Sequence, residues 1–414
     1  MMALQLSQTV QSCRLCAHPV LEDILDATTQ PPANSLRLPN ESEPVSIPLV
    51  LCRCAACGTI QLTETVDPAY LFSHYVWVTG TSAAAKLYAQ TFAQLVLARV
   101  HPGSLKVLEV ASNDGTFLRP FLSHGHNVVG VDPAANIAEV ANRAGIRTYP
   151  EFFGRNAAAK LLAEYGGFDV VFARNVIPHV KDPNDVVAGM VQALAPGGLL
   201  AIEFHRADVI LEELHYDSIY HEHLFYHSLA SMELLARLHG LHVFDVTVSP
   251  ISGGSYVAYF SRESKAPTDA LLQARAREER LGIAGAESWR RFAVQCKAHR
   301  DALRTEFESL RSAGGRIIGF GASARSSTLL NFAGIDSSML ACIADNNPLK
   351  SGRLTPGTNV PIVSSEEAFR VRPDAVLLLA WNFEEEIISE IQKKHGWTGP
   401  VLVPLPGQPR LRRI

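Results

Sequence analysis

Residues 105–145 constrain the fold of this chain more than any other stretch. They contain a β-rich run, a turn of small residues, a helical stretch and a second β-rich run ending in Asp132, and they read LKVLEVASNDGTFLRPFLSHGHNVVGVDPAANIAEVANRAG. This order is typical of the opening βαβ unit of a doubly wound sheet. Two later stretches, FDVVFARNVIPHV at 168–180 and LAPGGLLAIEF at 194–204, each add a predicted strand. The sequence therefore predicts an α/β domain built on a mainly parallel sheet.

Two acids occupy the positions at which such a sheet binds a nucleoside. Glu109 ends the first predicted strand, and Asp132 ends the second, where an acid hydrogen-bonds ribose hydroxyls. Between them lies the turn Ala-Ser-Asn-Asp-Gly at 111–115, which lacks the GxGxxG pattern that brings bare backbone amides to a pyrophosphate. Asn113 and Asp114 supply polar side chains instead. The pattern favours an adenosine ligand without phosphates.

Most of the cysteines fall near the N-terminus, which indicates a metal site rather than disulfides. Two CxxC pairs, Cys13 with Cys16 and Cys54 with Cys57, can each wrap two thiolates around one zinc ion. Together they complete a closed tetrahedral site, so the zinc is expected to be structural and to stabilise a small domain. Cys52 is a surplus cysteine beside the second pair, but Cys54 has the matching spacing.

Several short motifs, spread over nearly the whole chain, together resemble one enzyme family. They are CRLC (13–16), PPANS (31–35), CAACGTIQL (54–62), ASNDGTFLRP (111–120), GVDP (130–133), RNVIPHV (174–180), YHEHLFYHS (220–228), SGGS (252–255), GFGASARSSTLLN (319–331), NNPLKSGRLTPGTNVPI (346–362) and AWNFEEEI (380–387). The chain is similar to the tripartite sugar C-methyltransferases, which use S-adenosylmethionine (SAM) to alkylate a carbon beside the keto group of a nucleotide-linked deoxysugar.

The resemblance implies a three-part architecture and a cofactor site. We expect a zinc-binding domain (1–75), a class I methyltransferase domain with a doubly wound sheet (76–262), and a helical connector with a C-terminal Rossmann-like α/β domain (263–414). The residues expected to bind SAM are Glu109, Ala111, Asn113, Asp114, Gly115, Asp132, Pro133 and Asn175. Ala111 and Asn113 stand where methyltransferase turns usually carry glycines.

The stretch IYHEHLFY at 219–226 carries the candidate proton-transfer groups. Methylating carbon requires a base, because a proton alpha to a carbonyl must leave before an enolate can attack the methyl group. His223 can act as that base near neutral pH, and Tyr220 can donate to the enolate oxygen. Glu222 or another carboxylate can orient a neighbouring imidazole. The resemblance places Tyr220, Glu222 and His223 in the active site, with His179 and Tyr75 as companions.

Other interpretations of this stretch stay open at the level of sequence. If 219–226 is helical, Tyr220 and His223 share a face; if it is extended, His221 and His223 share one. His215, His221, His223 and His227 lie close enough together in the sequence to suggest a metal site, yet HExxH is missing. The histidines could also be core or surface residues with satisfied hydrogen bonds, and Tyr75 a packed aromatic.

A second βαβ unit follows a charged stretch, 262–313, that predicts one long helix or two. GRIIGFGASARSSTLLNFAGI at 315–335 predicts a strand, a glycine turn and a helix, and MLACIADNNPLKSG at 339–352 adds a strand that ends in Asp345. This unit is a dinucleotide site, a unit used only for packing, or a platform for the substrate's diphosphate. Ala324 at the third glycine position is compatible with a dinucleotide, but methyl transfer needs no hydride, so we favour the diphosphate. The expected substrate contacts are Gly321, Ser323, Arg325, Ser326, Ser327, Asn331, Arg353 and Trp381.

Composition limits the possible partners. The chain of 414 residues is 47% hydrophobic, has 37 Lys and Arg against 41 Asp and Glu, and carries a formal net charge of -4. It lacks a basic tract and a long apolar run, so we expect no nucleic-acid partner and no membrane, and a cytoplasmic monomer.

Two families of function follow. The first is C-methylation, at C-3, of a dTDP-linked 4-keto-deoxysugar in antibiotic biosynthesis. The alternative is an O- or N-methyltransferase acting on another small molecule of secondary metabolism, for which a base at His223 would be dispensable. A zinc-ribbon protein directed to RNA is disfavoured by the acidic balance.

Overall fold

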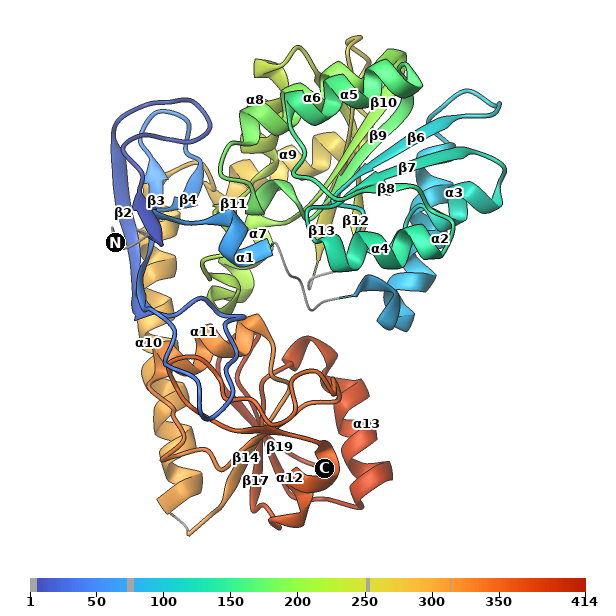
Figure 1. Cartoon of the computed structure of the whole chain (residues 1–414). Helices are drawn as coiled ribbons and strands as arrows, with labels where there is room; N and C mark the ends of the chain where they lie inside the picture. Colours follow the sequence, from blue (N-terminus) through green and yellow to red (C-terminus); the bar gives the residue numbers. More distant parts are fainter. Residues whose placement is uncertain (1–5, 73–77, 251–253, 313) are drawn as a thin grey trace, which may run out of the picture.

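The computed structural model describes residues 6–72, 78–250, 254–312 and 314–414. These residues form sheets of four, seven and six strands and one two-stranded pair. Figure 1 shows the N-terminal sheet beside the seven-stranded sheet, with the C-terminal domain below them and helix α10 running from the first to the last. The two α/β sheets confirm the predicted fold class.

The N-terminal sheet is antiparallel and has the order β11-β4-β3-β2. Its strands are β2 (Leu21–Gln30), β3 (Ile47–Cys54), β4 (Ile60–Leu62) and β11 (Phe225–Tyr226). A small pair, β1 (Ser7–Thr9) with β5 (Glu64–Val66), lies outside it, and the short helix α1 covers Pro68–Phe72. The sheet therefore takes its edge strand β11 from the middle of the chain, where it comprises the last two residues of the histidine-rich stretch 219–226.

The seven-stranded sheet has the order β12-β13-β10-β9-β6-β7-β8. Strand β13 runs antiparallel to both of its neighbours, whereas the pairs from β10 to β8 are parallel. The strands are β6 (Lys106–Val110), β7 (Asn127–Val131), β8 (Thr148–Tyr149), β9 (Phe168–Arg174), β10 (Leu194–His205), β12 (His242–Ser249) and β13 (Ser255–Ser261). Helices α2 (Ala83–Leu97), α3 (Arg119–Ser123), α4 (Ala135–Arg143), α5 (Arg155–Tyr165), α6 (Pro183–Ala193), α7 (Ala207–Glu213) and α8 (Leu229–Leu238) accompany it.

The order of these strands places a binding site at one edge. The chain proceeds outward from β6 through β7 to β8, then crosses back to β9 on the other side of β6. Loops after β6 and β9 therefore diverge, and the crevice at such a switch point is where open α/β sheets bind ligands. The turn 111–115 and Asn175 both lie at this point.

The C-terminal domain also contains a mainly parallel sheet, with six strands. Its sheet has the order β16-β15-β14-β17-β18-β19, parallel except for the last strand. The strands are β14 (Ile317–Phe320), β15 (Ile343–Ala344), β16 (Ile362–Val363), β17 (Ala375–Leu378), β18 (Pro400–Val403) and β19 (Arg410–Arg413). The helices are α11 (Ala324–Ala333), α12 (Ser365–Arg370) and α13 (Glu384–His395). The charged stretch before them forms two helices, α9 (Asp269–Leu281) and α10 (Ala286–Ser312).

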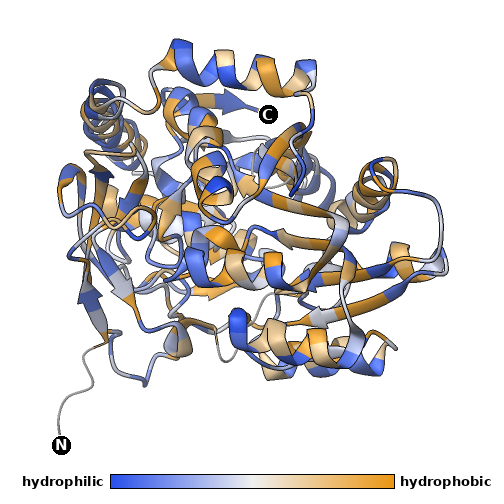
Figure 2. Cartoon of the chain, turned by 90° about the horizontal axis from the view of Figure 1, so that it is seen from above, coloured by the Kyte–Doolittle hydropathy of each residue, from blue (hydrophilic) through white to orange (hydrophobic). Residues whose placement is uncertain are grey.

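One hydrophobic core joins the first and last domains. It contains Leu49 and Leu51 of β3, Tyr216 and Ile219 before the histidine motif, and the apolar strands of the C-terminal sheet. Figure 2 shows hydrophobic and hydrophilic residues alternating along the outer helices, as expected for amphipathic helices that cover a sheet. Among the described residues, no helix is both long and apolar enough to cross a membrane.

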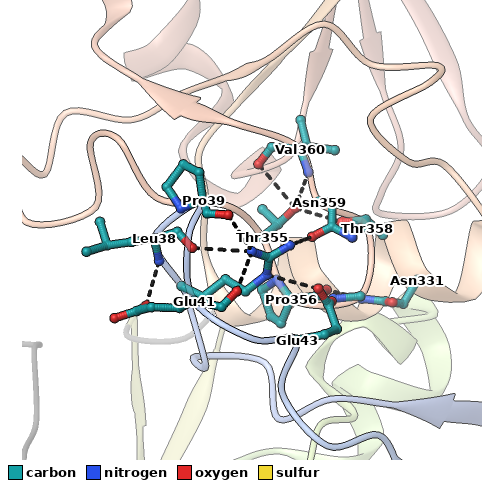
Figure 3. A network of polar contacts seen from close by, with 12 residues as sticks. Leu38, Pro39, Glu41, Glu43, Asn331, Thr355, Pro356, Thr358, Asn359 and Val360 are labelled. Carbon is teal, nitrogen blue, oxygen red and sulfur yellow. Dashed lines mark hydrogen bonds and ion pairs between the residues drawn. The ribbon is translucent and has the colours of Figure 1, made fainter.

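A loop between β2 and β3 reaches from the N-terminal sheet to the C-terminal domain. Arg37 pairs through its backbone with Leu354, and its guanidinium donates to Oδ1 of Asn359 at 2.6 Å. Glu43 accepts a hydrogen bond of 2.8 Å from the backbone N–H of Gly357. Figure 3 shows Glu43 and Asn359 within one network of polar contacts at this junction. The first and last domains are thus linked on two sides, by α10 and by this loop.

Candidate active site

The four cysteines of the two CxxC pairs meet in space. Their sulfur atoms all lie within 4.8 Å of one another, with 3.7 Å between Cys13 and Cys57 and 3.6 Å between Cys16 and Cys54. Thiolates bound tetrahedrally at about 2.3 Å from zinc would be roughly 3.8 Å apart, so this cluster fits the ion. Cys52 is buried in β3 outside the cluster. All four positions are filled by the protein, which leaves a structural zinc with no open coordination site.

The turn after β6 has the backbone shape of a ligand cradle. Ala111, Asn113 and Gly115 have φ angles of 54°, 50° and 76°, in the left-handed region that L residues rarely adopt. Asp132, at the end of β7, holds this turn by accepting the Asn113 N–H at 2.8 Å and the Ala134 N–H at 2.9 Å. An added Cβ at Gly115 would lie 2.5 Å from Ile146, so the chain needs glycine there.

Buried charge lies beneath this turn. The pKa of Glu109 is raised well above its ordinary value, chiefly because the carboxyl is buried. Arg174 donates to the buried Glu203 carboxylate at 2.6 Å, and the Asn175 N–H donates to the Glu203 carbonyl at 2.8 Å. Asn175 has a φ of 53° and follows β9 directly. Glu109, Arg174 and Asn175 therefore lie at the ends of β6 and β9, at the switch point of the sheet.

The predicted SAM ligands gather at this crevice. Glu109, Ala111, Asn113, Asp114, Gly115, Asp132, Pro133 and Asn175 all lie in β6 or in the segments that follow β6, β7 and β9. Asp114 already accepts the backbone N–H and the hydroxyl of Thr116, at 3.2 and 2.6 Å. Their contact with SAM stays a prediction, but the donor set suits a nucleoside with a charged amino-acid tail.

Residues 220–223 of the histidine motif form a turn, and its last two residues, Phe225 and Tyr226, form strand β11. The His223 N–H donates to the Tyr220 carbonyl at 2.9 Å, which folds residues 220–223 back on themselves. The Tyr220 hydroxyl consequently lies 2.8 Å from Nε2 of His223. Nδ1 of His223 lies 3.1 Å from the Ser218 carbonyl, which can only accept, so Nδ1 carries the proton. Nε2 is therefore the unprotonated nitrogen and accepts from Tyr220.

His179 stands against His223. Their ring centroids are 4.6 Å apart in an edge-on arrangement, and His179 Nδ1 donates to the Glu222 carbonyl at 2.6 Å. Burial lowers the pKa of His179 to about 4, and burial with His179 and His205 nearby lowers the pKa of His223 well below its usual range. Because His179 belongs to the 3₁₀ helix Ile177–His179 that follows β9, the pair lies at the same sheet edge as the SAM crevice.

Glu222 is a buried carboxyl with one known partner. Its Oε1 accepts from the backbone N–H and the side-chain amide of Asn34, at 3.2 and 3.1 Å. Its Oε2 has no hydrogen-bond partner within the described parts of the chain, and burial raises the pKa of Glu222. Asn34 comes from PPANS, a motif whose role nothing in the sequence spacing indicated. Tyr75 lies outside the described residues.

The other histidines of the motif are structural. Buried His221 donates to the carbonyls of Ile47 and Pro48, both at 3.2 Å, and so ties the turn to β3. Buried His227 stacks on Phe225 with 5.0 Å between ring centroids. Within the described ranges, the four cysteines are the only group of three or more His, Cys, Asp and Glu with metal-binding geometry. The geometry of those residues does not support a metal site among these histidines.

The predicted substrate contacts of the C-terminal domain are mostly engaged with the protein. Arg325 and Trp381 both bind Asp217, and Ser323 caps α11 by accepting the Ser326 N–H at 3.2 Å. Gly321 has a φ of 97°, and an added Cβ would lie 2.4 Å from that of Ala380. The remaining members also have partners in the protein: Ser326, Ser327, Asn331 and Arg353. Binding of a diphosphate by these residues stays a prediction.

Neutral histidines whose pKa is lowered by desolvation make the fold sensitive to acid. Burial lowers the pKa of each of these side chains: His179, His205, His215, His221, His223, His227 and His299. Above pH 6.5 such a histidine is neutral in both folded and unfolded chains; below it, only the unfolded chain takes up the proton. Stability should therefore fall as the pH drops below 6.5, by up to about 1.4 kcal/mol per pH unit for each group, until the folded pKa is reached.

Urea unfolding at pH 7.5, 6.5 and 5.5 measures this effect as a falling midpoint. The slope of the unfolding free energy against pH gives the number of protons taken up on unfolding. His227→Phe should lower that number by about one, since His227 is fully buried and its pKa is lowered to about 3. His242→Gln, at an exposed position, is the matched control and should leave the slope unchanged. A midpoint that does not move between pH 7.5 and 5.5 would contradict the prediction.

Comparisons with known protein families match three consecutive regions of the chain. Residues 13–72 match a zinc binding domain family, 82–246 a methyltransferase domain family, and 250–406 a family described as the C-methyltransferase C-terminal domain. C-methyltransferase NovU of Streptomyces niveus is 32% identical over 410 residues, covering 97% of each chain. A ubiquinone biosynthesis O-methyltransferase of Caulobacter sp. (strain K31) is 33% identical over 24% of this chain and 40% of its own.

A solved structure also aligns with part of the chain. Magnesium protoporphyrin IX methyltransferase of Synechocystis PCC 6803, with bound SAM, covers 44% of this chain and 80% of its own, at 13% identity and a TM-score of 0.33.

Proposed function

The chain belongs to the family of tripartite SAM-dependent C-methyltransferases, and from this premise we propose that it methylates C-3 of a dTDP-linked 4-keto-deoxysugar through an enolate. The enzyme is a SAM-dependent C-methyltransferase with a structural zinc. The nucleotide, the 4-keto group, the carbon that is methylated, the place in antibiotic biosynthesis and the monomeric state belong to the proposal. So do domain limits at residues 75 and 262.

The observation that carries the proposal is the bond between Tyr220 and Nε2 of His223. An O- or N-methyltransferase needs little or no base, whereas carbon must lose a proton first. Here an imidazole with a defined tautomer presents its unprotonated nitrogen, 2.8 Å from a hydroxyl that can donate. Both side chains are partly exposed, while the neighbouring His221 and Glu222 are buried. The pair is therefore the accessible part of the motif.

The proposed chemistry assigns one task to each of these groups. Nε2 of His223 takes the proton from the carbon beside the ketone, and the electron pair of the broken C–H bond forms the enolate. The Tyr220 hydroxyl turns from His223 to donate to the enolate oxygen. SAM supplies an electrophilic methyl group, so the enolate carbon forms the new C–C bond while the electrons of the C–S bond stay on sulfur. The lowered pKa of His223 keeps the base unprotonated at neutral pH.

The surrounding residues have supporting roles in this scheme. The His179 ring packs edge-on against the His223 ring. The backbone carbonyl of Glu222 accepts a hydrogen bond from Nδ1 of His179 and so holds the His179 ring in that position. We place SAM over the turn 111–115, with Asp132 near the ribose hydroxyls and Glu109 beneath the turn. The substrate would enter between the methyltransferase and C-terminal domains, where its diphosphate would meet the start of α11. Tyr75 stays a candidate companion of the base.

Solvent deuterium exchange tests the proposal directly. The enzyme is incubated in deuterated water with a dTDP-4-keto-6-deoxysugar and no methyl donor, and the sugar is analysed by mass spectrometry and NMR. We expect deuterium at C-3, because the base can form the enolate without SAM. With SAM, the product should gain one methylene on carbon. A product methylated on oxygen or nitrogen, without exchange at carbon, would favour the O- or N-methyltransferase alternative.

A further inference from the structure

The segment just before the catalytic turn is held by the C-terminal part of the chain. This segment is the 3₁₀ helix Tyr216–Ser218 with Ile219. Tyr216 is buried, and its hydroxyl lies 2.9 Å from Nδ1 of His299 in α10. Because Nε2 of His299 donates to the Pro404 carbonyl at 2.7 Å, its Nδ1 accepts from Tyr216. The first residue of the segment is therefore tied to the C-terminal domain.

Asp217 makes the second tie. Its carboxylate is 1% exposed and accepts Nε and Nη2 of Arg325 at 3.0 and 2.8 Å, in a two-point contact. Trp381 donates its indole N–H to the same carboxylate at 2.8 Å, and the Arg325 guanidinium lies 4.6 Å from the centre of the Trp381 ring. Arg325 is the second residue of α11, and Trp381 begins the 3₁₀ helix Trp381–Phe383 after β17, so two helical segments of the C-terminal domain converge on one carboxylate of the methyltransferase domain.

Ile219 makes the third tie. Its backbone carbonyl accepts the hydroxyl of Thr328 at 2.9 Å, and Thr328 is a buried residue one turn further along α11. The Ser218 carbonyl instead meets the histidine motif, where it lies 3.1 Å from Nδ1 of His223 and accepts the Tyr226 hydroxyl at 3.5 Å. The carbonyl that selects the His223 tautomer therefore lies between two residues that α11 holds.

We propose that Arg325 and Thr328 of α11 are positioning residues for His223, acting through Asp217 and Ile219 on the Ser218 carbonyl. The inference rests on the proposed role of His223 as base. The Ile219 carbonyl that Thr328 holds belongs to the next peptide plane, and the two rigid planes share the Cα atom of Ile219, so a displacement of Ile219 shifts the Ser218 carbonyl as well. If that carbonyl turns away, the proton of the neutral ring can move to Nε2, and a ring protonated there cannot accept a second proton at that atom.

Thr328→Val is the informative variant. Valine has nearly the same shape but no hydroxyl, so it removes the bond to Ile219 and leaves that carbonyl without this donor. Thr328→Ser keeps the hydroxyl and is the rescue control. Glu43→Gln weakens a different contact between the first and last domains without touching residues 216–219, and it controls for loosened domain packing. SAM affinity and zinc content report whether each variant is folded.

Two measurements separate positioning from general stability. The first is the rate of solvent deuterium exchange at the sugar carbon, expected to fall by roughly 10–100-fold in Thr328→Val with an unchanged Kd for SAM. The second is ¹⁵N NMR of histidine-labelled protein, in which His223 should show one tautomer in the wild type and a mixture in Thr328→Val. Thr328→Ser and Glu43→Gln should match the wild type in both.

The outcomes distinguish this inference from the proposed function. Slow exchange with mixed tautomers in Thr328→Val alone supports positioning. A wild-type tautomer in Thr328→Val overturns it, whether exchange is slow or not. If His223→Gln still exchanges deuterium, His223 is not the base and the proposed function fails at that step, while the NMR result still decides whether α11 sets the tautomer.

Discussion

Replacing His223 by glutamine is expected to lower kcat for C-methylation, and the rate of deuterium exchange, by roughly 10²–10⁴-fold. Glutamine occupies similar space and can still donate to the Ser218 carbonyl, but it cannot take a proton at neutral pH. The Kd for SAM should stay within about twofold, because the SAM contacts that we propose lie in the turn 111–115 and at Asp132, and not at His223. Rapid quench of single turnovers, with calorimetry for SAM binding, measures both quantities.

His221→Gln is the matched control for this experiment. His221 stands two residues before His223 but is buried and donates to the Ile47 and Pro48 carbonyls. A glutamine amide can donate there too, so we expect a loss of no more than about tenfold, and mainly of stability. If His221→Gln were as slow as His223→Gln, the defect would be one of folding. If His223→Gln retained most of its activity, another group would have to be the base.

Replacing Cys54 by alanine is expected to remove the zinc and unfold the N-terminal sheet. Structural zinc contributes about 10 kcal/mol or more in small metal-dependent domains, which a sheet of this size cannot supply from its core. Unfolding of this sheet should also disturb the turn 220–223. Asn34 of the N-terminal domain binds Glu222, and the carbonyls of Ile47 and Pro48 accept from His221. Zinc analysis, proteolysis of the N-terminal region and kcat should therefore change together.

The neighbouring cysteine provides the control. Cys52 lies two residues earlier in the same strand and is as buried as Cys54, yet its sulfur is outside the cluster. Cys52→Ala should keep one zinc per chain and cost about 1 kcal/mol of stability from lost packing. Chelation of the wild type should reproduce the Cys54→Ala defect, and added zinc should reverse it. A Cys54→Ala protein with full zinc content would show that Cys52 replaces it as ligand.

The parts of the site that were predictable lie close together in the sequence. The CxxC pairs determine which sulfurs can share an ion, and the strand–turn–strand order around Glu109 and Asp132 determines which loops meet at the sheet edge. The contacts made by the turn 220–223 and the strand that follows it were not predictable in this way. Phe225 pairs with Gln61 of β4, and Glu222 binds Asn34, which is 188 residues away in the chain. No local period or spacing encodes such a partner.

Arg325 illustrates the difference most directly. Its place at the start of a helix after a glycine turn suggested contact with a phosphate, because helix N-termini favour anions. In the folded chain the guanidinium is paired with Asp217, 108 residues earlier, and the anion it meets belongs to the protein. An isolated carboxylate could not stay buried at that position, so the packing of the two domains requires a cation there.

The sequence by itself determined the two α/β sheets and the zinc-binding cysteines, since these depend on side-chain chemistry and short-range order, and it supplied the residues that we propose transfer a proton. Only the tertiary structure decided that Tyr220 and His223 face each other across a turn, which tautomer His223 adopts, and that three domains hold this turn. The physical reason is that a hydrogen bond needs its partner within about 3 Å in the right direction, and the partners come from chain segments that only folding brings together.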